Sequence, residues 1–306
     1  MTATHQFKVV SAFLIIYFVW GSTYLAIRLT LDAVPAFFSM GLRFFIAAVL
    51  IFIWIKPGKI RQVTLKQAIN SLAVGFMLMG LGTGPVAWAV RYVPTGVTAM
   101  IIAVLPVWFV LFEKLLKNRA ELGVVSCVGI GISIAGSLLL MGITDINAFT
   151  KVPLLPFLVI LISCFFWAFA SVWGSTLEKP EHNFTDVAIQ MAGGVACNLM
   201  IGLFLGEYKQ INYSGMDFTF VMAVLYLSIF GSVLVYGAYN FLIKHINTAL
   251  VATHSYVNPI VAVFLGWLFL EEIIDTRMIL SSLMVLSGVT LIRVGYRKSG
   301  SLKIKA

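Results

Sequence analysis

The stretch VPTGVTA at residues 93–99 returns as INTALVA at residues 246–252, and the two copies lie 153 positions apart. At the same offset, the LPV of residues 105–107 is matched by the NPI of residues 258–260. One such match could arise by chance, but ordered matches at one offset are typical of an internal duplication. The sequence therefore predicts two copies of one structural unit.

Three further pairs of residues occur in the same order in both copies, at offsets between 147 and 153 positions. They are Trp20 and Trp167, Gly84 and Gly237, and Gly136 and Gly288. The two copies join in the segment from Asp145 to Pro153. We place the first unit at residues 1–146 and the second at residues 147–306, which ends in a short basic tail.

Hydrophobic residues make up 60% of the 306 positions and charged residues 11%, which is more apolar surface than a soluble domain buries. Lipid is therefore the predicted solvent, and a helix needs about 20 residues to cross it. Strand alternation is absent from the sequence, which argues against a membrane β-barrel. Ten spans are predicted, near residues 9–27, 36–55, 67–90, 95–112, 122–141, 153–174, 185–205, 217–241, 247–269 and 278–296.

The predicted fold class is an all-α membrane protein with ten transmembrane helices, arranged as two five-helix repeats. Because each repeat has an odd number of spans, its two copies enter the bilayer from opposite sides. Many secondary transporters build two alternating gates from such inverted repeats, around one site near the middle of the membrane. The architecture therefore favours a carrier.

The net charge of +9 is explained by the predicted topology. With the N-terminus inside, most lysines and arginines fall in the cytoplasmic connections and the C-terminal tail. The connections on the opposite side hold only Arg28, Arg91, Lys151, Lys209 and Arg277. By the positive-inside rule, both termini are predicted to be cytoplasmic. The expected partners are the lipid bilayer and a small-molecule substrate, no nucleic acid is expected, and the chain is expected to be a monomer or a homodimer.

The sequence predicts no cofactor or metal. Cys127, Cys164 and Cys197 lie separately within predicted spans, where they are typical of small apolar fillers rather than of a disulfide or a metal site. The glycines of the third and fifth spans permit close helix packing. They lie in apolar helices with no strand before them and no lysine-serine pair after them, which excludes a nucleotide-binding loop.

Several motifs resemble the signatures of the EamA family, within the drug/metabolite transporter superfamily. They are FVWGSTY at residues 18–24, Arg43 inside the second span, and SYVNP at residues 255–259 followed by LEE at residues 270–272. The resemblance extends from about residue 10 to residue 296. It implies ten helices in two inverted repeats, a bacterial inner-membrane location and export of amino acids or other small metabolites. Members of a family differ in substrate, so the resemblance does not fix the cargo.

Arg43 is a charged residue in the middle of a predicted span, where an arginine costs about 2.5–3.5 kcal/mol on insertion scales. No acidic residue lies deep in any predicted span to neutralise it. One interpretation is a fixed positive charge in a wet cavity that attracts a substrate carboxylate or another anion. The other is a structural role, in which the side chain caps backbone carbonyls or holds helices together.

His254 is the only histidine deep in a predicted helix, and Asn258 lies one turn further on the same face. Pro259 follows, and it frees a backbone carbonyl one turn earlier. His254 is predicted either to contact the substrate or a coupled proton, or to hold two helices together by hydrogen bonds. A smaller or hydroxyl residue is usual here in the EamA pattern, so the resemblance implies a role for His254 in substrate choice.

Aromatic and polar residues recur at helical spacing on the first, sixth and eighth spans. They are Trp20 and Tyr24, Trp167 and Ser171, and Tyr236, Tyr239 and Asn240. Such stripes are packing surfaces in most helices, and aromatic residues near helix ends belong to the interfacial belt. Trp20 and Trp167 lie well inside their spans, so the duplication also allows them to face each other across one pocket.

Glycine and proline residues mark candidate hinges for gate movement at Gly84, Pro85, Pro106 and Pro259. Glu271 and Glu272 end the ninth span, where helix capping or loop pairing is predicted rather than cargo binding.

The favoured function is a secondary transporter that works by alternating access. No Walker lysine motif is present, which argues against direct ATP coupling in this chain. An exporter of drug cations needs an intramembrane carboxylate, so a neutral, zwitterionic or anionic metabolite such as an amino acid is expected. Two coupling modes are compatible with the sequence, facilitated diffusion and proton linkage through His254. A flippase of a lipid-linked anion is the alternative. An intramembrane enzyme is disfavoured, because no acid, base or nucleophile pair lies at helical spacing.

Overall fold

A computed structural model describes residues 3–55, 62–117, 123–140, 153–246, 251 and 254–298 of the chain, and these residues form helices and connecting segments without a strand. The helices of the first half are α1 (Ala3–Thr30), α2 (Ala36–Trp54), α4 (Leu65–Gly75), η1 (Phe76–Leu81), α5 (Gly84–Ala89), α6 (Thr95–Ile102), α7 (Leu105–Lys117) and α8 (Val124–Leu140). Of these, η1 is a π-helical turn.

The second half follows the same plan, with two short 3₁₀ turns added after its second helix. Its helices are α9 (Leu154–Gly174), α10 (Asn183–Phe204), η3 (Glu207–Gln210), η4 (Tyr213–Gly215), α11 (Phe218–Ser228), η5 (Ile229–Leu234), α12 (Val235–His245), α14 (His254–Leu270) and α15 (Thr276–Lys298). Like η1, η5 is a π-helical turn. The predicted junction at residues 141–152, part of the predicted ninth span and the basic tail lie outside the described residues.

Seven helical segments of the described chain are long and apolar enough to cross a membrane. They are His5–Thr30, Ala36–Trp54, Leu65–Ala89, Thr95–Lys117, Leu154–Gly174, Asn183–Phe204 and Phe218–His245. Three shorter apolar helices accompany them, at Val124–Gly136, Val257–Leu270 and Thr276–Gly288. The prediction of an all-helical membrane protein is confirmed.

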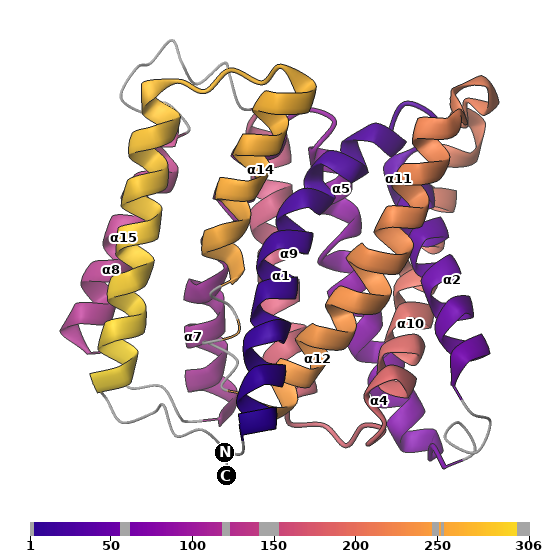
Figure 1. Cartoon of the computed structure of the whole chain (residues 1–306), viewed down its shortest axis with the longest axis horizontal. Helices are drawn as coiled ribbons and strands as arrows, with labels where there is room; N and C mark the ends of the chain where they lie inside the picture. Colours follow the sequence, from indigo (N-terminus) through magenta and orange to yellow (C-terminus); the bar gives the residue numbers. More distant parts are fainter. Residues whose placement is uncertain are drawn as a thin grey trace.

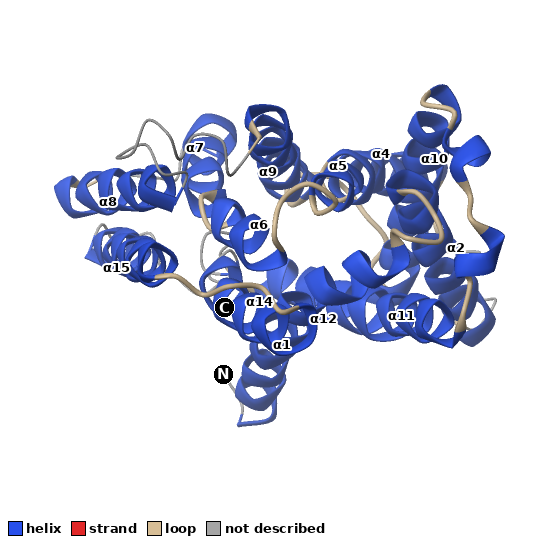
Figure 2. Ribbon diagram, turned by 90° about the horizontal axis from the view of Figure 1, so that it is seen from above, coloured by secondary structure: helices blue, strands red, loops and turns tan. Residues whose placement is uncertain are grey.

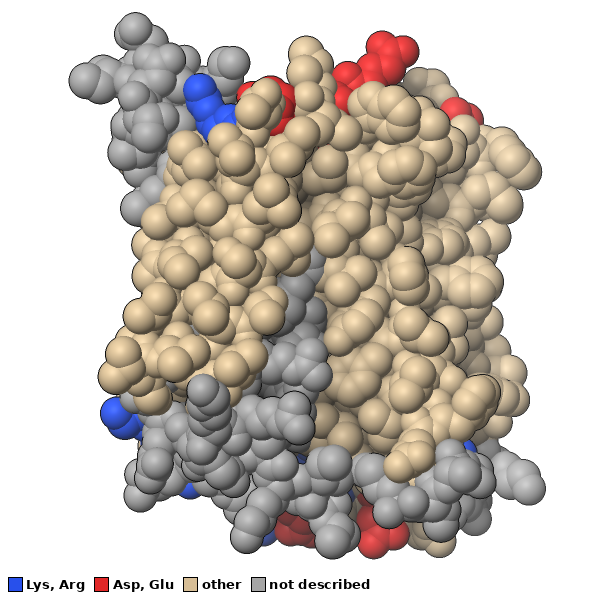
Figure 3. Space-filling model, turned by 60° about the vertical axis from the view of Figure 1, so that its left-hand side comes forward, with Lys and Arg blue, Asp and Glu red and all other residues tan. Residues whose placement is uncertain are grey.

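The helices run between two ends of one bundle, and the first helix begins at the same end at which α15 finishes (Figure 1). We call this the terminal end and the opposite one the distal end. Between the two ends, the described residues on the visible surface include no lysine, arginine or acidic residue, whereas such side chains gather at both ends (Figure 3). Phe18, Phe45 and Phe264 are each more than half exposed on the bundle's surface. A helical bundle presents an apolar surface of this kind, between two charged ends, to the lipid tails of a membrane.

The two π-helical turns occupy matching places in the two halves. Residues 76–81 and 229–234 are separated by the same 153 positions as the sequence repeat. Each π turn lies inside the third long span of its half, between two stretches of α-helix. A π turn leaves backbone groups outside the regular hydrogen-bond ladder, and in lipid these groups need other partners.

Equivalent helices of the two halves pack against each other. The second helices, α2 and α10, lie side by side toward one edge of the bundle, and the last helices, α8 and α15, form a separate pair at the opposite edge (Figure 2). The first helix of each half contacts the fourth segment of the other, as α1 contacts α14 and α9 contacts α7. The interior between these pairs is therefore built from both halves.

Carboxylates of the second half cap helices of the first half at the distal end. Glu207 accepts hydrogen bonds from the backbone N–H groups of Phe37 and Phe38, at 3.3 and 2.9 Å, near the start of α2. Glu272 accepts from the N–H of Thr95 at 2.7 Å and of Gly96 at 3.3 Å, at the start of α6. A negative charge at a helix start is favourable and satisfies otherwise unpaired donors. The predicted capping role of Glu272 is confirmed.

Glycine permits the close crossing of α4 and α10. A Cβ atom built on Gly193 would lie 2.2 Å from the carbonyl oxygen of Leu72, and one built on Gly75 would lie 1.8 Å from that of Gln190. Backbones approach this closely only where no side chain intervenes. These glycines bring α10 against the third span, next to its π turn.

We expect Gly193→Ala to separate α4 from α10 and to lower the melting temperature of the purified protein by about 3 °C or more, because overpacking a tight contact costs about 1–3 kcal/mol. Gly131→Ala is the matched control, since a Cβ atom there meets nothing within 4 Å. Melting followed by size-exclusion chromatography in detergent measures both variants. Equal melting temperatures for the two would contradict the close crossing.

Candidate functional site

A narrow cavity of about 50 Å³ lies in the middle of the bundle, between the two halves. Water needs about 10–15 Å³ of such volume, so the cavity has room for a few water molecules. The first half lines it with Trp20, Thr23, Tyr24, Ile27, Arg43, Gly82, Thr83, Val86, Ile102 and Leu105. The second half contributes Ser163, Cys164, Trp167, His254 and Asn258.

Trp20 lies at the centre of a cluster of aromatic rings. Its ring centroid lies 4.6 Å from that of His254, 5.0 Å from Tyr239, 5.2 Å from Trp167 and 5.5 Å from Tyr236. Three of these contacts are edge-to-face, which is a favourable geometry for aromatic pairs. The rings come from α1, α9, α12 and α14, so the cluster joins the first helix to three helices of the second half.

A layer of hydrogen bonds behind the rings fixes their orientation. The hydroxyl of Tyr239 lies 2.7 Å from that of Ser171 and accepts a hydrogen bond from the indole nitrogen of Trp167 at 3.2 Å. Ser171 also donates to the carbonyl of Trp167 at 2.8 Å. The Tyr236 hydroxyl and the Asn240 side-chain nitrogen are buried without a hydrogen-bond partner among the described residues. Tyr239 and Ser171 therefore support the cavity wall from outside it.

His254 and Asn258 form a hydrogen-bonded pair on the cavity side of α14. With the amide oxygen of Asn258 turned toward the ring, it accepts from Nδ1 of His254 at 3.2 Å. The amide nitrogen then donates to the carbonyls of Tyr17 and His254, both at 2.9 Å. Nε2 of His254 is buried without a hydrogen-bond partner among the described residues. The pair leaves one ring nitrogen as a free acceptor at the cavity.

Arg43 is 1% exposed and connects α2 to the π turn of the other half. Its Nε donates to the hydroxyl of Ser232 at 2.8 Å, and one terminal nitrogen donates to the carbonyl of Gly231. Among the described residues, the second terminal nitrogen has one hydrogen-bond acceptor, the sulfur of Met40 at 3.8 Å, which is a weak acceptor. Arg43 also lines the cavity. Arg43 therefore bonds to the backbone of the other half and is part of the cavity wall.

The equivalent helix of the second half makes a similar connection to the first π turn. Asn198 of α10 donates to the carbonyl of Met79 in η1 at 3.0 Å. The hydroxyl of Thr83 donates to the same carbonyl at 3.0 Å, as Ser232 donates to the carbonyl of Leu227 near η5 at 2.8 Å. Both π turns are thus completed by one hydroxyl of their own span and one donor from the other half.

Six of the predicted site residues line the cavity together. They are Trp20, Tyr24, Arg43, Trp167, His254 and Asn258. Ser171, Tyr236 and Tyr239 lie in the layer behind them, and Asn240 is buried outside the lining. Sequence reasoning missed Thr23, Thr83, Ser163 and Cys164 as lining residues. Thr23 is part of the FVWGSTY motif and Thr83 directly precedes Gly84, so both residues lie next to positions that the sequence already marks as candidates.

The predicted hinges lie in three spans, and in two of these spans they lie next to a break between helices. Gly84 and Pro85 begin α5 after the η1 turn, and a Cβ atom on Gly84 would lie 2.3 Å from the Asn198 side-chain oxygen. Pro106 lies in the first turn of α7, after the break that separates α6 from α7. Pro259 is inside α14, one turn after Ser255. Their role in gate movement stays a prediction.

The family model of the EamA-like transporter family matches the chain twice, at residues 7–142 and at residues 154–294. The chain belongs to the EamA-like transporter family. The resemblance inferred from the motifs is confirmed, and the protein is a membrane transporter rather than an enzyme.

Relatives of this EamA-like protein carry the names of transporters. An inner membrane transporter of Escherichia coli strain K12, YedA, which is described as uncharacterized, is 32% identical over 82% of this chain and 79% of its own length. A probable amino-acid metabolite efflux pump of the same strain is 21% identical over 95% of this chain and 96% of its own length. A solved crystal structure superposes with a TM-score of 0.68 at 16% identity, and covers 95% of this chain and 98% of that one. It shares the fold.

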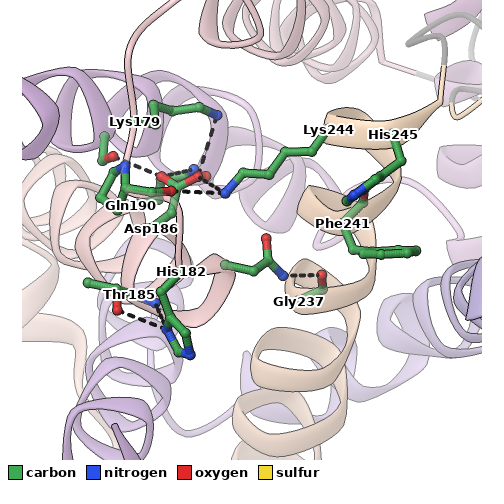
Figure 4. A network of polar contacts seen from close by, with 12 residues as sticks. Lys179, His182, Thr185, Asp186, Gln190, Gly237, Phe241, Lys244 and His245 are labelled. Carbon is green, nitrogen blue, oxygen red and sulfur yellow. Dashed lines mark hydrogen bonds and ion pairs between the residues drawn. The ribbon is translucent and has the colours of Figure 1, made fainter. Parts of the chain in front are cut away.

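A second polar cluster of this EamA-like transporter lies at the terminal end, around Asp186 (Figure 4). Asp186 is fully buried at the start of α10, and its two ion-pair partners are Lys179 at 3.6 Å and Lys244 of α12 at 3.5 Å. Ser71 of α4 and Gln190 donate to its other oxygen, both at 2.8 Å. The cluster joins α4, α10 and α12 at the end opposite to Glu207 and Glu272.

We expect Asp186→Asn to lower the melting temperature by about 5 °C or more. The substitution leaves two ammonium groups without their counter-charge, and breaking a buried ion pair from one side costs about 3–5 kcal/mol. Glu178→Gln is the matched control, because the Glu178–Lys66 pair is also close, at 3.1 Å, but both side chains are at least half exposed. Thermal melting in detergent that showed equal shifts would contradict the assignment of Asp186 as the centre of the cluster.

Proposed function

We propose that this protein is a secondary transporter that exports a small zwitterionic or anionic metabolite, of the amino-acid class, across a bacterial inner membrane by alternating access. The substrate occupies the central cavity between the two halves. The fold is ten transmembrane helices in two inverted five-helix repeats, at about residues 1–146 and 147–306, and the terminal end faces the cytoplasm.

Three observations support the inverted repeats. The family model matches each half separately, at residues 7–142 and 154–294. The π turns recur at the offset of the sequence repeat. Equivalent helices pack as pairs, with α2 against α10 and α8 against α15. Such a pairing is expected when two copies of one unit are related by a pseudo-twofold axis in the membrane plane.

The charge of Arg43 carries the proposal for the substrate. In the second half, the neutral side chain of Asn198 completes the equivalent π turn. An arginine costs about 2.5–3.5 kcal/mol in a span, so completing a π turn does not by itself explain a charged residue. Arg43 lines the central cavity, and within the described part of the chain one of its terminal nitrogens has only a weak sulfur acceptor. A carboxylate in the cavity supplies the missing partner, with geometry that suits a guanidinium.

The rest of the cavity suits an amino acid with an apolar side chain. Trp20 and Trp167 offer ring surfaces, and Nε2 of His254 offers one free acceptor for an ammonium or amide group. The relative named as a probable amino-acid metabolite efflux pump supports the same class of cargo. At about 50 Å³ the cavity is smaller than an amino acid, so the two halves must separate on at least one side for the substrate to enter. That requirement supports alternating access.

Transport from proteoliposomes loaded with labelled solutes tests the proposal. We expect efflux of leucine and threonine, weak efflux of succinate, and none of the cationic leucine methyl ester. Arg43→Gln should reduce amino-acid efflux by about tenfold or more, because a charged hydrogen bond to the carboxylate is worth about 1.5–3 kcal/mol. Glutamine can still donate to the Gly231 carbonyl, so the fold is expected to survive.

Arg28→Gln is the matched control for this experiment. Arg28 is an exposed arginine at the distal end of α1, paired with Asp32 at 3.1 Å and outside the cavity lining. Its loss should leave efflux unchanged. Equal efflux from Arg43→Gln and Arg28→Gln would show that the cavity charge does not bind the cargo.

A further inference from the structure

A second pocket, of about 230 Å³, opens at the distal end of the bundle. It is lined by Leu31, Ala36, Trp88, Arg91, Tyr92, Leu205, Glu207 and Gln210. These residues come from the ends of α1, α5 and α10, the start of α2, and the η3 turn. The pocket is more than four times the volume of the central cavity, and it is large enough for a small metabolite.

Opposite charges line this pocket without pairing with each other. Arg91 donates one hydrogen bond, from a terminal nitrogen to the carbonyl of Leu31 at 2.9 Å, and its side chain is exposed. Glu207 is 4% exposed and contacts two backbone N–H groups of α2. No ion pair between Arg91 and Glu207 occurs among the interactions of the described residues. The two charges therefore share the pocket without a direct ion pair between them.

The environment of Glu207 shows that its charge is incompletely compensated. Burial raises the pKa of its carboxyl above the ordinary value, while the N–H groups of Phe38 and Phe37 and the positive charge of Arg91 oppose the shift. The net direction is upward, so the cap and the arginine together do not offset the loss of water. An ammonium group in the pocket would supply the remaining compensation.

The pocket lies directly beyond the central cavity along two helices. On α1, Ile27 lines the central cavity and Leu31 lines the distal pocket, which is one helical turn or about 6 Å further on. In and just after α5, Val86 lines the central cavity, whereas Trp88 and Arg91 line the distal pocket. The two spaces are therefore neighbours along α1 and α5.

We infer that the distal pocket is a second binding site, for a zwitterionic α-amino acid, with the substrate carboxylate on Arg91 and its ammonium group on Glu207. Trp88, whose ring centroid lies 4.9 Å from that of Tyr92, and the side chains of Leu31 and Leu205 contact the substrate's apolar side chain. The inference rests on the proposed function for the choice of an amino acid. The distal pocket is then a second binding site, which the substrate occupies after it leaves the central cavity and before it is released.

Binding of three matched compounds to the purified full-length protein in nanodiscs tests the inference. L-leucine carries both charged groups, leucine methyl ester keeps only the ammonium group, and 4-methylpentanoate keeps only the carboxylate. Isothermal titration is carried out on a background in which Trp20→Ala and His254→Ala disable the central cavity. We expect L-leucine to bind this background protein, and the two singly charged compounds to bind at least about tenfold more weakly.

Arg91→Gln and Glu207→Gln, each added to that background, should weaken L-leucine binding by about tenfold or more. Lys209→Gln is the control, because Lys209 is an exposed base of the same η3 turn that does not line the pocket. Arg91→Gln is the more specific test of the pocket, because Glu207→Gln also changes the hydrogen bonds that cap α2.

The outcomes separate the distal site from the central one. L-leucine binding that survives the central substitutions and is lost with Arg91→Gln supports the inference. Binding that is lost with the central substitutions alone, or that is unchanged by Arg91→Gln, overturns it and leaves the proposed function intact. Failure of wild-type vesicles to release any amino acid, with distal binding retained, would instead contradict the proposed function.

Discussion

The fold depends on a constraint that lipid imposes: every backbone carbonyl inside the membrane needs a hydrogen-bond donor from the protein. A straight α-helix meets this need by itself, but the π turns η1 and η5 do not. Donors from the opposite half complete both turns, Asn198 for the first and Arg43 for the second. The same bonds that satisfy the backbone therefore hold the two halves together beside the central cavity.

The two halves of the duplicated chain differ in the side chains that complete their π turns. The two halves share helix order and the placement of their π turns, but the donors differ, because an amide serves one turn and a guanidinium serves the other. The amide nitrogen of Asn198 donates to two backbone carbonyls, that of Met79 at 3.0 Å and that of Gly194 at 2.8 Å. Arg43 lines the cavity, and among the described residues one of its terminal nitrogens has only the Met40 sulfur as an acceptor. The two connections therefore differ in charge, although they serve matching π turns.

Much of the fold was predictable from the sequence, because apolar length and the repeat at residues 93–99 and 246–252 depend on local composition and order. The six lining residues recovered from motifs also lie on predicted helix faces. The π turns were not predictable, since their residues FMLMGL and IFGSVL carry no helix-breaking signal beyond one glycine each. Nor was Asp186 predicted as a junction, because a carboxylate near a helix start is ordinary until Lys179 and Lys244 are brought to it by tertiary packing.

Helix α10 connects these features from one end of the bundle to the other. At the terminal end Asp186 joins it to Ser71 of α4, in the middle Asn198 joins it to η1, and just beyond its distal end Glu207 caps α2. All three contacts are with the first half, so α10 is fixed to α2 and the third span as one body. The ion pair from Asp186 to Lys244 of α12 is different, because it crosses to the helix that carries Tyr236 and Tyr239 behind the cavity. Through this ion pair, α10 is also joined to the aromatic rings that surround Trp20.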